Sequence, residues 1–119
     1  MGVRLQEALA TAFAAPAADH VELARVAWPV LARPDMDPLF SLFFESNGLA
    51  AAGREPYRTL TAQLVGLWAT WLAGFFDGTE ADRRIEAEAT IALVDGLLLL
   101  RQVSGAAAAN RAATRLGIR

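Results

Sequence analysis

The spacing of apolar residues constrains the fold of this chain more than any other feature of its sequence. Apolar residues recur every three or four positions along nearly the whole chain, and no segment alternates strictly between apolar and polar residues as a half-buried strand does. This pattern predicts an all-α fold, a six-helix bundle. The six helices are expected at residues 3–15, 18–33, 38–52, 56–75, 80–104 and 106–116. Because the connections are short and single domains usually have roughly 100–150 residues, residues 1–119 are expected to form one domain.

Prolines and glycines set the expected ends of these helices. Pro16 should end the first helix, and Pro29 should kink or split the second, because proline cannot continue a helix interior without losing a hydrogen bond. Asp37 is expected to cap the third helix, with Pro38 at its first position, where a missing N–H has no cost. Gly53 fits the end of that helix.

Charge and residue usage exclude several classes of function. The net charge is −2, lysine is absent, and the arginines are scattered among acidic residues. Proteins that bind nucleic acid usually carry a basic patch, because their cations displace the counterions of the phosphates. We therefore expect no direct binding of nucleic acid by this chain. The absence of cysteine excludes disulfides and thiolate zinc sites.

The same features bear on location. The first fifteen residues lack the basic flank and unbroken apolar core of a signal peptide. Residues 59–76 carry no charge and have about the minimum length of a membrane span, but threonines and a glutamine dilute them, which is typical of a buried bundle helix. We expect a cytoplasmic protein that does not enter a membrane. Abundant arginine and alanine without lysine suggest a GC-rich bacterial genome.

The sequence contains no recognisable set of catalytic residues. His20 is the single histidine, no serine has a base at a recognisable spacing, and no lysine is present. Asp19, His20 and Glu22 do not share a helix face, so a metal site there is disfavoured. His20 is expected to be a solvated residue near a helix start. We expect no enzyme activity, no metal site and no cofactor.

Two aromatic stripes, on the third and fourth expected helices, offer a possible wall for an apolar ligand. Ligand sites are mostly apolar with a few polar groups that fix orientation, and Asn47 lies on the first stripe. The alternative interpretation is that the rings are ordinary core packing and Asn47 bonds a neighbouring backbone group. The candidate ligand-binding residues are Phe40, Phe43, Phe44, Asn47, Leu64, Trp68, Trp71 and Phe75.

Asp95 interrupts the long apolar run of the fifth expected helix. A buried carboxylate without a partner is costly, so Asp95 should be paired, exposed or protonated. At helical spacing it aligns with Arg84, Glu88 and Gln102. This alignment favours a solvated or salt-bridged polar seam, with contact to a ligand as the alternative.

The fifth expected helix carries apolar residues on two sides, and a helix of this kind packs against two partners. We assign one stripe, Ile91, Val94 and Leu98, to the core of the domain. The other contains small residues that favour close helix contact, and we assign it to a second copy of the chain in a homodimer. Its residues are Ile85, Ala89, Ala92, Leu93, Gly96, Leu100 and Val103. A separate polar face is expected to contain Glu86, Thr90 and Arg101.

Several segments of the chain resemble the C-terminal regions of TetR-family transcriptional regulators. They are "PLFSLFFESNGLA", "REPYRTL", "LVGLWATWLAGFF" and "IALVDGLLLLRQVSG", followed by a short alanine-rich tail. In that family an N-terminal helix-turn-helix head binds DNA, the C-terminal helices form a ligand pocket, and the last two long helices pair with their copies in the dimer. The segment at residues 91–105 carries the resemblance most clearly.

The resemblance implies a ligand-sensing, homodimerising regulatory domain without the DNA-binding head. It implies a small, apolar ligand as a partner besides the second subunit. The alternative is a helical interaction protein that has no small-molecule ligand. Both interpretations use the high hydrophobic content of 55%, which is more than one copy of so small a chain can bury.

Overall fold

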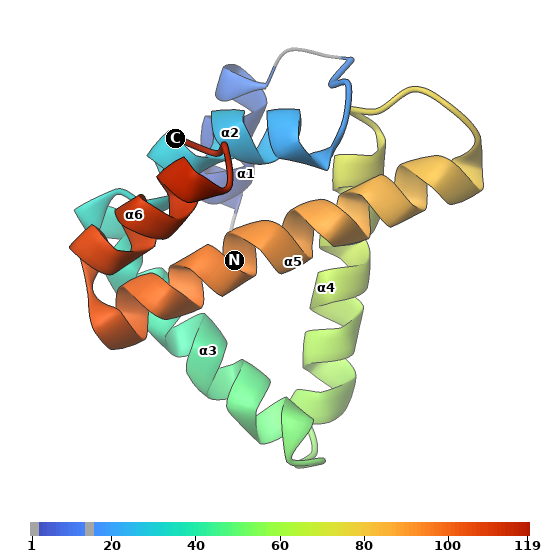
Figure 1. Ribbon diagram of the computed structural model, residues 1–119. Helices are drawn as coiled ribbons and strands as arrows, with labels where there is room; N and C mark the ends of the chain where they lie inside the picture. Colours follow the sequence, from blue (N-terminus) through green and yellow to red (C-terminus); the bar gives the residue numbers. More distant parts are fainter. Residues whose placement is uncertain (1–2, 14–15) are drawn as a thin grey trace.

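The computed structural model describes residues 3–13 and 16–119. Its secondary structure is helical, which confirms the predicted all-α bundle (Figure 1). The helices are α1 (Val3–Ala12), α2 (His20–Leu31), the short 3₁₀ helix η1 (Pro34–Met36), α3 (Asp37–Ala51), α4 (Tyr57–Ala73), α5 (Glu80–Ser104) and α6 (Ala106–Arg115). Within the described residues, extended pairing is confined to one bridge between Ala17 and Phe76, where the Ala17 N–H donates to the Phe75 carbonyl at 2.8 Å.

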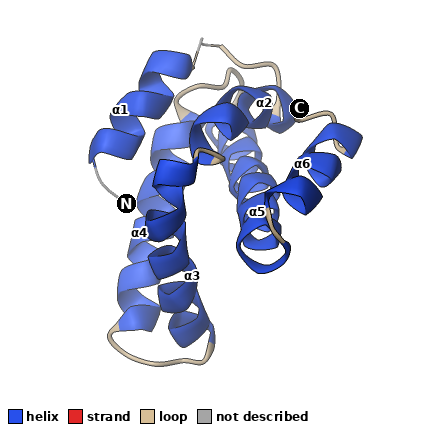
Figure 2. Ribbon diagram, turned by 90° about the vertical axis from the view of Figure 1, so that its left-hand side faces the viewer, coloured by secondary structure: helices blue, strands red, loops and turns tan. Residues whose placement is uncertain are grey.

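Helix α5 is the longest helix and crosses the whole molecule (Figure 1). It packs against α2, α3, α4 and α6, while α1 packs against α2. Helices α3 and α4 contact each other and are joined by a loop at one end of the molecule, from which they diverge (Figures 1 and 2). Helix α6 turns back along α5, so that the C-terminal turn reaches α2 (Figures 1 and 2).

Helix α5 begins and ends where the sequence predicts. The Thr79 hydroxyl accepts a hydrogen bond from the backbone N–H of Asp82 at 3.1 Å, as an N-cap does. After Ser104, Gly105 takes a φ of +97°, a conformation that only glycine adopts readily. Strong signals at both ends therefore define this helix locally.

Proline has a smaller effect than the sequence predicts. Helix α1 ends at Ala12, before Pro16; the predicted last residues, 14 and 15, lie outside the described part of the chain. Pro29 is predicted to kink or split α2; the split is wrong, because α2 continues through Pro29 as one helix. Trp28 and Leu31 beside it are buried, and this packing holds the helix together across the missing hydrogen bond.

Asp37 does not cap α3, contrary to prediction. Its carboxylate instead accepts two hydrogen bonds from Arg101, from Nε to Oδ1 at 2.8 Å and from a terminal guanidinium nitrogen to Oδ2 at 3.1 Å. The Arg101 side chain is only 10% exposed, and Thr90 is 1% exposed, so the predicted polar face of Glu86, Thr90 and Arg101 is largely covered by other parts of the protein. These side chains face neighbouring helices, because α5 is surrounded on most of its circumference.

His20 also has a structural partner. It is the first residue of α2, as expected for a residue near a helix start, but it is not simply solvated. One Glu86 oxygen lies 2.8 Å from His20 Nδ1 and accepts the His20 backbone N–H at 2.7 Å. This pair connects the start of α2 to α5.

The apolar core has a main part and a smaller satellite. The main part contains Leu5, Leu9, Ala24, Ala27, Trp28, Leu31, Phe40, Phe43, Val94, Leu97, Leu98, Ala109, Ala113 and Ile118. The satellite contains Ala17, Leu23, Ala69, Leu72, Phe76 and Ala87. Val94 and Leu98 of α5 are therefore core residues, as the stripe assignment predicts.

Candidate functional site

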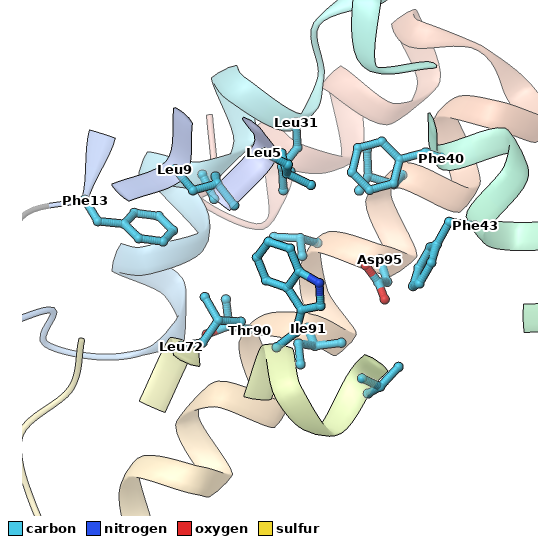
Figure 3. Close-up of a pocket in the computed structure, with 15 residues that line it drawn as sticks. Leu5, Leu9, Phe13, Leu31, Phe40, Phe43, Leu72, Thr90, Ile91 and Asp95 are labelled. Atoms are coloured by element: carbon cyan, nitrogen blue, oxygen red, sulfur yellow. The ribbon is translucent and has the colours of Figure 1, made fainter. Parts of the chain in front are cut away.

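A cavity of about 50 Å³ lies where five helices converge (Figure 3). Its walls come from α1 to α5 and from Phe13, which follows α1 directly. The lining residues are Leu5, Leu9, Phe13, Ala27, Leu31, Phe40, Phe43, Val65, Trp68, Leu72, Thr90, Ile91, Val94, Asp95 and Leu98. Almost all of these side chains are apolar, which is the usual character of a small-molecule site.

Three of the eight predicted ligand-binding residues, Phe40, Phe43 and Trp68, line this cavity. Phe40 and Phe43 are buried and contact each other edge to face, with ring centres 6.3 Å apart. They come from α3, whereas Trp68 comes from α4. The two aromatic stripes therefore meet at this cavity, but only some residues of each stripe line it.

Trp71 and Phe75, also predicted, lie outside the cavity. Their rings are 5.0 Å apart, and both contact Phe13, at 5.9 Å for Trp71 and 4.8 Å for Phe75. They form an aromatic cluster behind one wall of the cavity. This is the ordinary packing that the alternative interpretation proposed for the stripe.

The remaining predicted residues, Phe44, Asn47 and Leu64, do not line the cavity either. Phe44 packs against Phe43, with ring centres 5.6 Å apart. Asn47 is partly buried, and its Oδ1 atom has no hydrogen-bond partner within the described residues. The predicted backbone bond of Asn47 is therefore not seen at this atom, and Asn47 is not the polar group of the cavity.

That polar group is Asp95. Its side chain lines the cavity at the same end as Phe43, opposite Phe13 (Figure 3). No hydrogen bond or ion pair reaches its carboxyl from the described residues, and burial raises its pKa to about 6. The other polar wall residue on α5, Thr90, already donates its hydroxyl to the Glu86 carbonyl at 2.8 Å.

Along the predicted polar seam of α5, Asp95 has no ion-pair partner among the described residues, so the salt-bridged form of the seam is not seen at this position. Arg84 and Glu88 form an exposed pair at 3.8 Å, and Gln102 donates to the Asp37 carbonyl at 3.1 Å. Asp95 lies between these two groups but has no partner in either. Its side chain lines the cavity, whose wall includes the rings of Phe40, Phe43 and Trp68.

Sequence reasoning missed the contribution of α1 and α2 to the site. Leu5, Leu9 and Phe13 close one side of the cavity, and Ala27 and Leu31 add to it. The only available signal was the apolar stripe of the first helix. Such a stripe shows that a face is buried but does not show what it covers.

A second hollow, of about 290 Å³, lies between α3 and α4 on the molecular surface. We call it the α3–α4 groove, and its lining residues are Leu39, Leu42, Phe43, Ser46, Tyr57, Leu60, Thr61 and Leu64. Leu64, a predicted ligand-binding residue, belongs to this groove. Phe43 lines both the groove and the cavity, so its ring is a wall between them.

The predicted dimer residues lie along the outer side of α5. Ile85 and Val103 are 61% and 76% exposed, and Ala92 and Gly96 are exposed as well. Ala89, Leu93 and Leu100 flank them and are partly buried. Leu99, 48% exposed, lies on the same side but was not predicted. This outer face of α5 is apolar and uncovered in the single chain.

Comparison with known proteins gives no relative: no protein-family model, no curated protein and no solved structure matches this chain. Within residues 3–13 and 16–119, no cluster of three or more histidine, aspartate or glutamate side chains is placed to hold a metal ion. In the same residues, every helix is too short or too polar to cross a membrane.

Proposed function

We propose that this chain is the ligand-sensing, homodimerising regulatory domain of a TetR-like transcriptional regulator. The observation that carries the proposal is the apolar cavity at the meeting point of α1 to α5. It lies within a helical bundle, takes aromatic residues from both predicted stripes, and contains one carboxyl group that has no partner among the described residues. The resemblance of residues 91–105 and neighbouring segments to TetR-family C-terminal regions supports the regulatory role.

The proposed mechanism is a shift between two conformations of the helices. A ligand that binds one arrangement of the cavity walls better than another changes the populations by the difference in its two affinities. Helix α5 provides Thr90, Ile91, Val94, Asp95 and Leu98 to the cavity. A change in the cavity therefore acts on α5 directly, and α5 also carries the proposed dimer contacts.

The outer face of α5 supports the proposed homodimer. Specific interfaces bury roughly 1,200–2,000 Å² in total and have an apolar centre. On this face Ala92 and Gly96 leave room for a second helix, and a Cβ atom added at Gly96 has no atom within 4 Å in the single chain. Ile85 and Val103 frame this space with large apolar side chains that are otherwise in water.

Tryptophan fluorescence tests the ligand-sensing role. A variant that keeps only Trp68, with Trp28 and Trp71 replaced by phenylalanine, reports on the cavity wall. Small apolar compounds should change its emission saturably. Phe43→Ala should change the affinity at least about threefold, because aromatic contact is removed from the wall. Asn47→Leu is the matched control on the same helix; it lies outside the cavity and should leave the affinity unchanged.

The rival function, a helical interaction protein without a ligand, is favoured by the small volume of the cavity. Ligand sites usually measure about 300–1,000 Å³, far more than this cavity alone. The two functions differ in the titration. If a broad set of apolar compounds gives no saturable change while the protein still dimerises, the interaction protein is the better description.

A further inference from the structure

Asp95 is an unusual residue for the wall of an apolar cavity. Every other side chain that lines the described cavity is uncharged. The carboxyl group has lost much of its water, because burial is the cause of its raised pKa, and it has no cationic partner among the described residues. A pKa of about 6 still leaves the group mostly ionised at neutral pH. The protein thus keeps a poorly solvated negative charge at the end of an apolar space.

We propose that the cavity and the α3–α4 groove together bind a small organic amine, whose ammonium group pairs with Asp95 and whose apolar body lies against the aromatic wall. This inference rests on the proposed ligand-sensing function and specifies its ligand class.

The charge of Asp95 is the first argument for an amine. A hydrogen bond between ionised groups is about twice as strong as one between neutral groups, and the attraction grows where water is excluded. An anionic ligand would be repelled at the same place. A metal ion would need several ligands, but no group of three or more carboxylates or histidines is placed to hold one in the described residues, and Asp95 is the one such side chain among the lining residues of this cavity.

The surroundings of Asp95 are the second argument. Phe40, Phe43 and Trp68 line the same cavity, and the faces of aromatic rings attract cations. In Figure 3, Phe43 lies next to Asp95 at one end of the cavity. A carboxylate beside aromatic rings provides both kinds of contact that an organic ammonium group uses in proteins.

Phe43 explains where the body of the ligand finds room. The cavity of about 50 Å³ takes only a few atoms, whereas the groove beyond Phe43 measures about 290 Å³. Because the Phe43 ring separates the two, a change of its rotamer would join them. The joined space reaches the lower end of the usual range for ligand sites, about 300 Å³.

Benzylamine and benzyl alcohol form a matched pair of probes, since they differ mainly in the charge of the group attached to the ring. Isothermal titration calorimetry with the full chain at neutral pH should show benzylamine binding at least about tenfold more tightly, which corresponds to about 1.4 kcal/mol. Asp95→Asn keeps the size of the side chain and removes its charge, so it should abolish this preference. Glu88→Gln removes an exposed charge from the same helix, outside the cavity, and should leave the preference intact.

The outcomes separate this inference from the proposed function. If both probes bind equally well, or if Asp95→Asn retains the preference for benzylamine, the amine assignment is overturned while the ligand site remains. If neither probe binds and the apolar compounds of the fluorescence titration do not bind either, both the amine assignment and the ligand-sensing function are overturned. Circular dichroism of each variant establishes that it is folded in these comparisons.

Discussion

Replacing Asp95 with asparagine should stabilise the folded protein at neutral pH, and the stabilisation should disappear in mild acid. Burial raises the pKa of Asp95 from its ordinary value of 3.8 to about 6. The folded protein therefore binds this proton more tightly than the unfolded chain does, and protonation favours folding. The stabilisation of the folded state by protonated Asp95 is fully present below the unfolded pKa of 3.8 and is lost as the pH rises through about 6.

The size of the effect follows from the shift. Each pKa unit corresponds to about 1.36 kcal/mol, so a shift of about two units makes ionised Asp95 cost about 3 kcal/mol of folding free energy above pH 7. Asparagine has no proton to lose. The free energy of unfolding of the variant should therefore exceed that of the wild type by about 3 kcal/mol at pH 7.5 but by only about 0.5 kcal/mol at pH 4.

Urea denaturation of the wild type and Asp95→Asn at several pH values measures this difference. The pKa of Asp37 is held below its ordinary value by the Arg101 guanidinium, and this pair weakens in acid, but it is present in both proteins and cancels. Protein concentration must be held constant, because association with a second copy raises apparent stability. Glu88→Gln, which removes an exposed charge from the same helix outside the cavity, is the matched control.

A difference that is the same at pH 4 and pH 7.5 would refute the reasoning. So would a destabilised Asp95→Asn at neutral pH, because it would mean that the carboxylate has a stabilising partner in the folded protein.

Three further predictions concern other parts of the molecule. Gly96→Arg should give a folded monomer in light scattering, since arginine is a better helix former by about 0.8 kcal/mol and a Cβ atom at this position has no atom within 4 Å in the single chain. Gly48→Arg on α3, where an added Cβ is equally free, should leave a dimer, and an unchanged Gly96→Arg dimer would remove the outer face of α5 as the interface. Arg101→Ala should lower the free energy of unfolding by about 1–2 kcal/mol in urea denaturation, because it breaks the partly buried pair with Asp37; no loss would mean that this pair adds nothing. The acidic chain should give no shift of DNA in gel electrophoresis at physiological salt, and a salt-sensitive shift at sub-micromolar protein would contradict this.

The helices of this protein could largely be predicted from the sequence because their signals are local. Thr79 and Gly105 define α5 from within a few residues of its ends. The inward stripe of Val94 and Leu98 could be predicted for the same reason, since helical spacing alone places them on one face. Pro29 shows the limit of local signals, because the buried neighbours of α2 outweigh a single lost hydrogen bond.

The cavity could be predicted only in part because it depends on how helices from distant parts of the chain meet. A stripe indicates which face of a helix is apolar but not whether the facing atoms touch it or leave a gap. Phe40, Trp68 and Trp71 look equivalent in the sequence, yet Phe40 and Trp68 line the cavity, whereas Trp71 packs against Phe13 and Phe75 outside it. The ion pairs of α5 show the same limit, because Arg84 and Glu88 align with Asp95 at helical spacing but pair with each other.

Asp95 and Gly96 are consecutive residues, and α5 turns one toward the cavity and the next toward the outside. The helix between Glu80 and Ser104 has 25 residues, which makes it a rod of about 37 Å. A rod of that length magnifies small rotations: a tilt of about 5° about one end moves the other end by about 3 Å. If two copies meet on the outer face of this rod, the angle at which the two α5 helices cross is coupled directly to what occupies the cavity. A few atoms beside Asp95 would then be enough to change the relative orientation of two whole subunits.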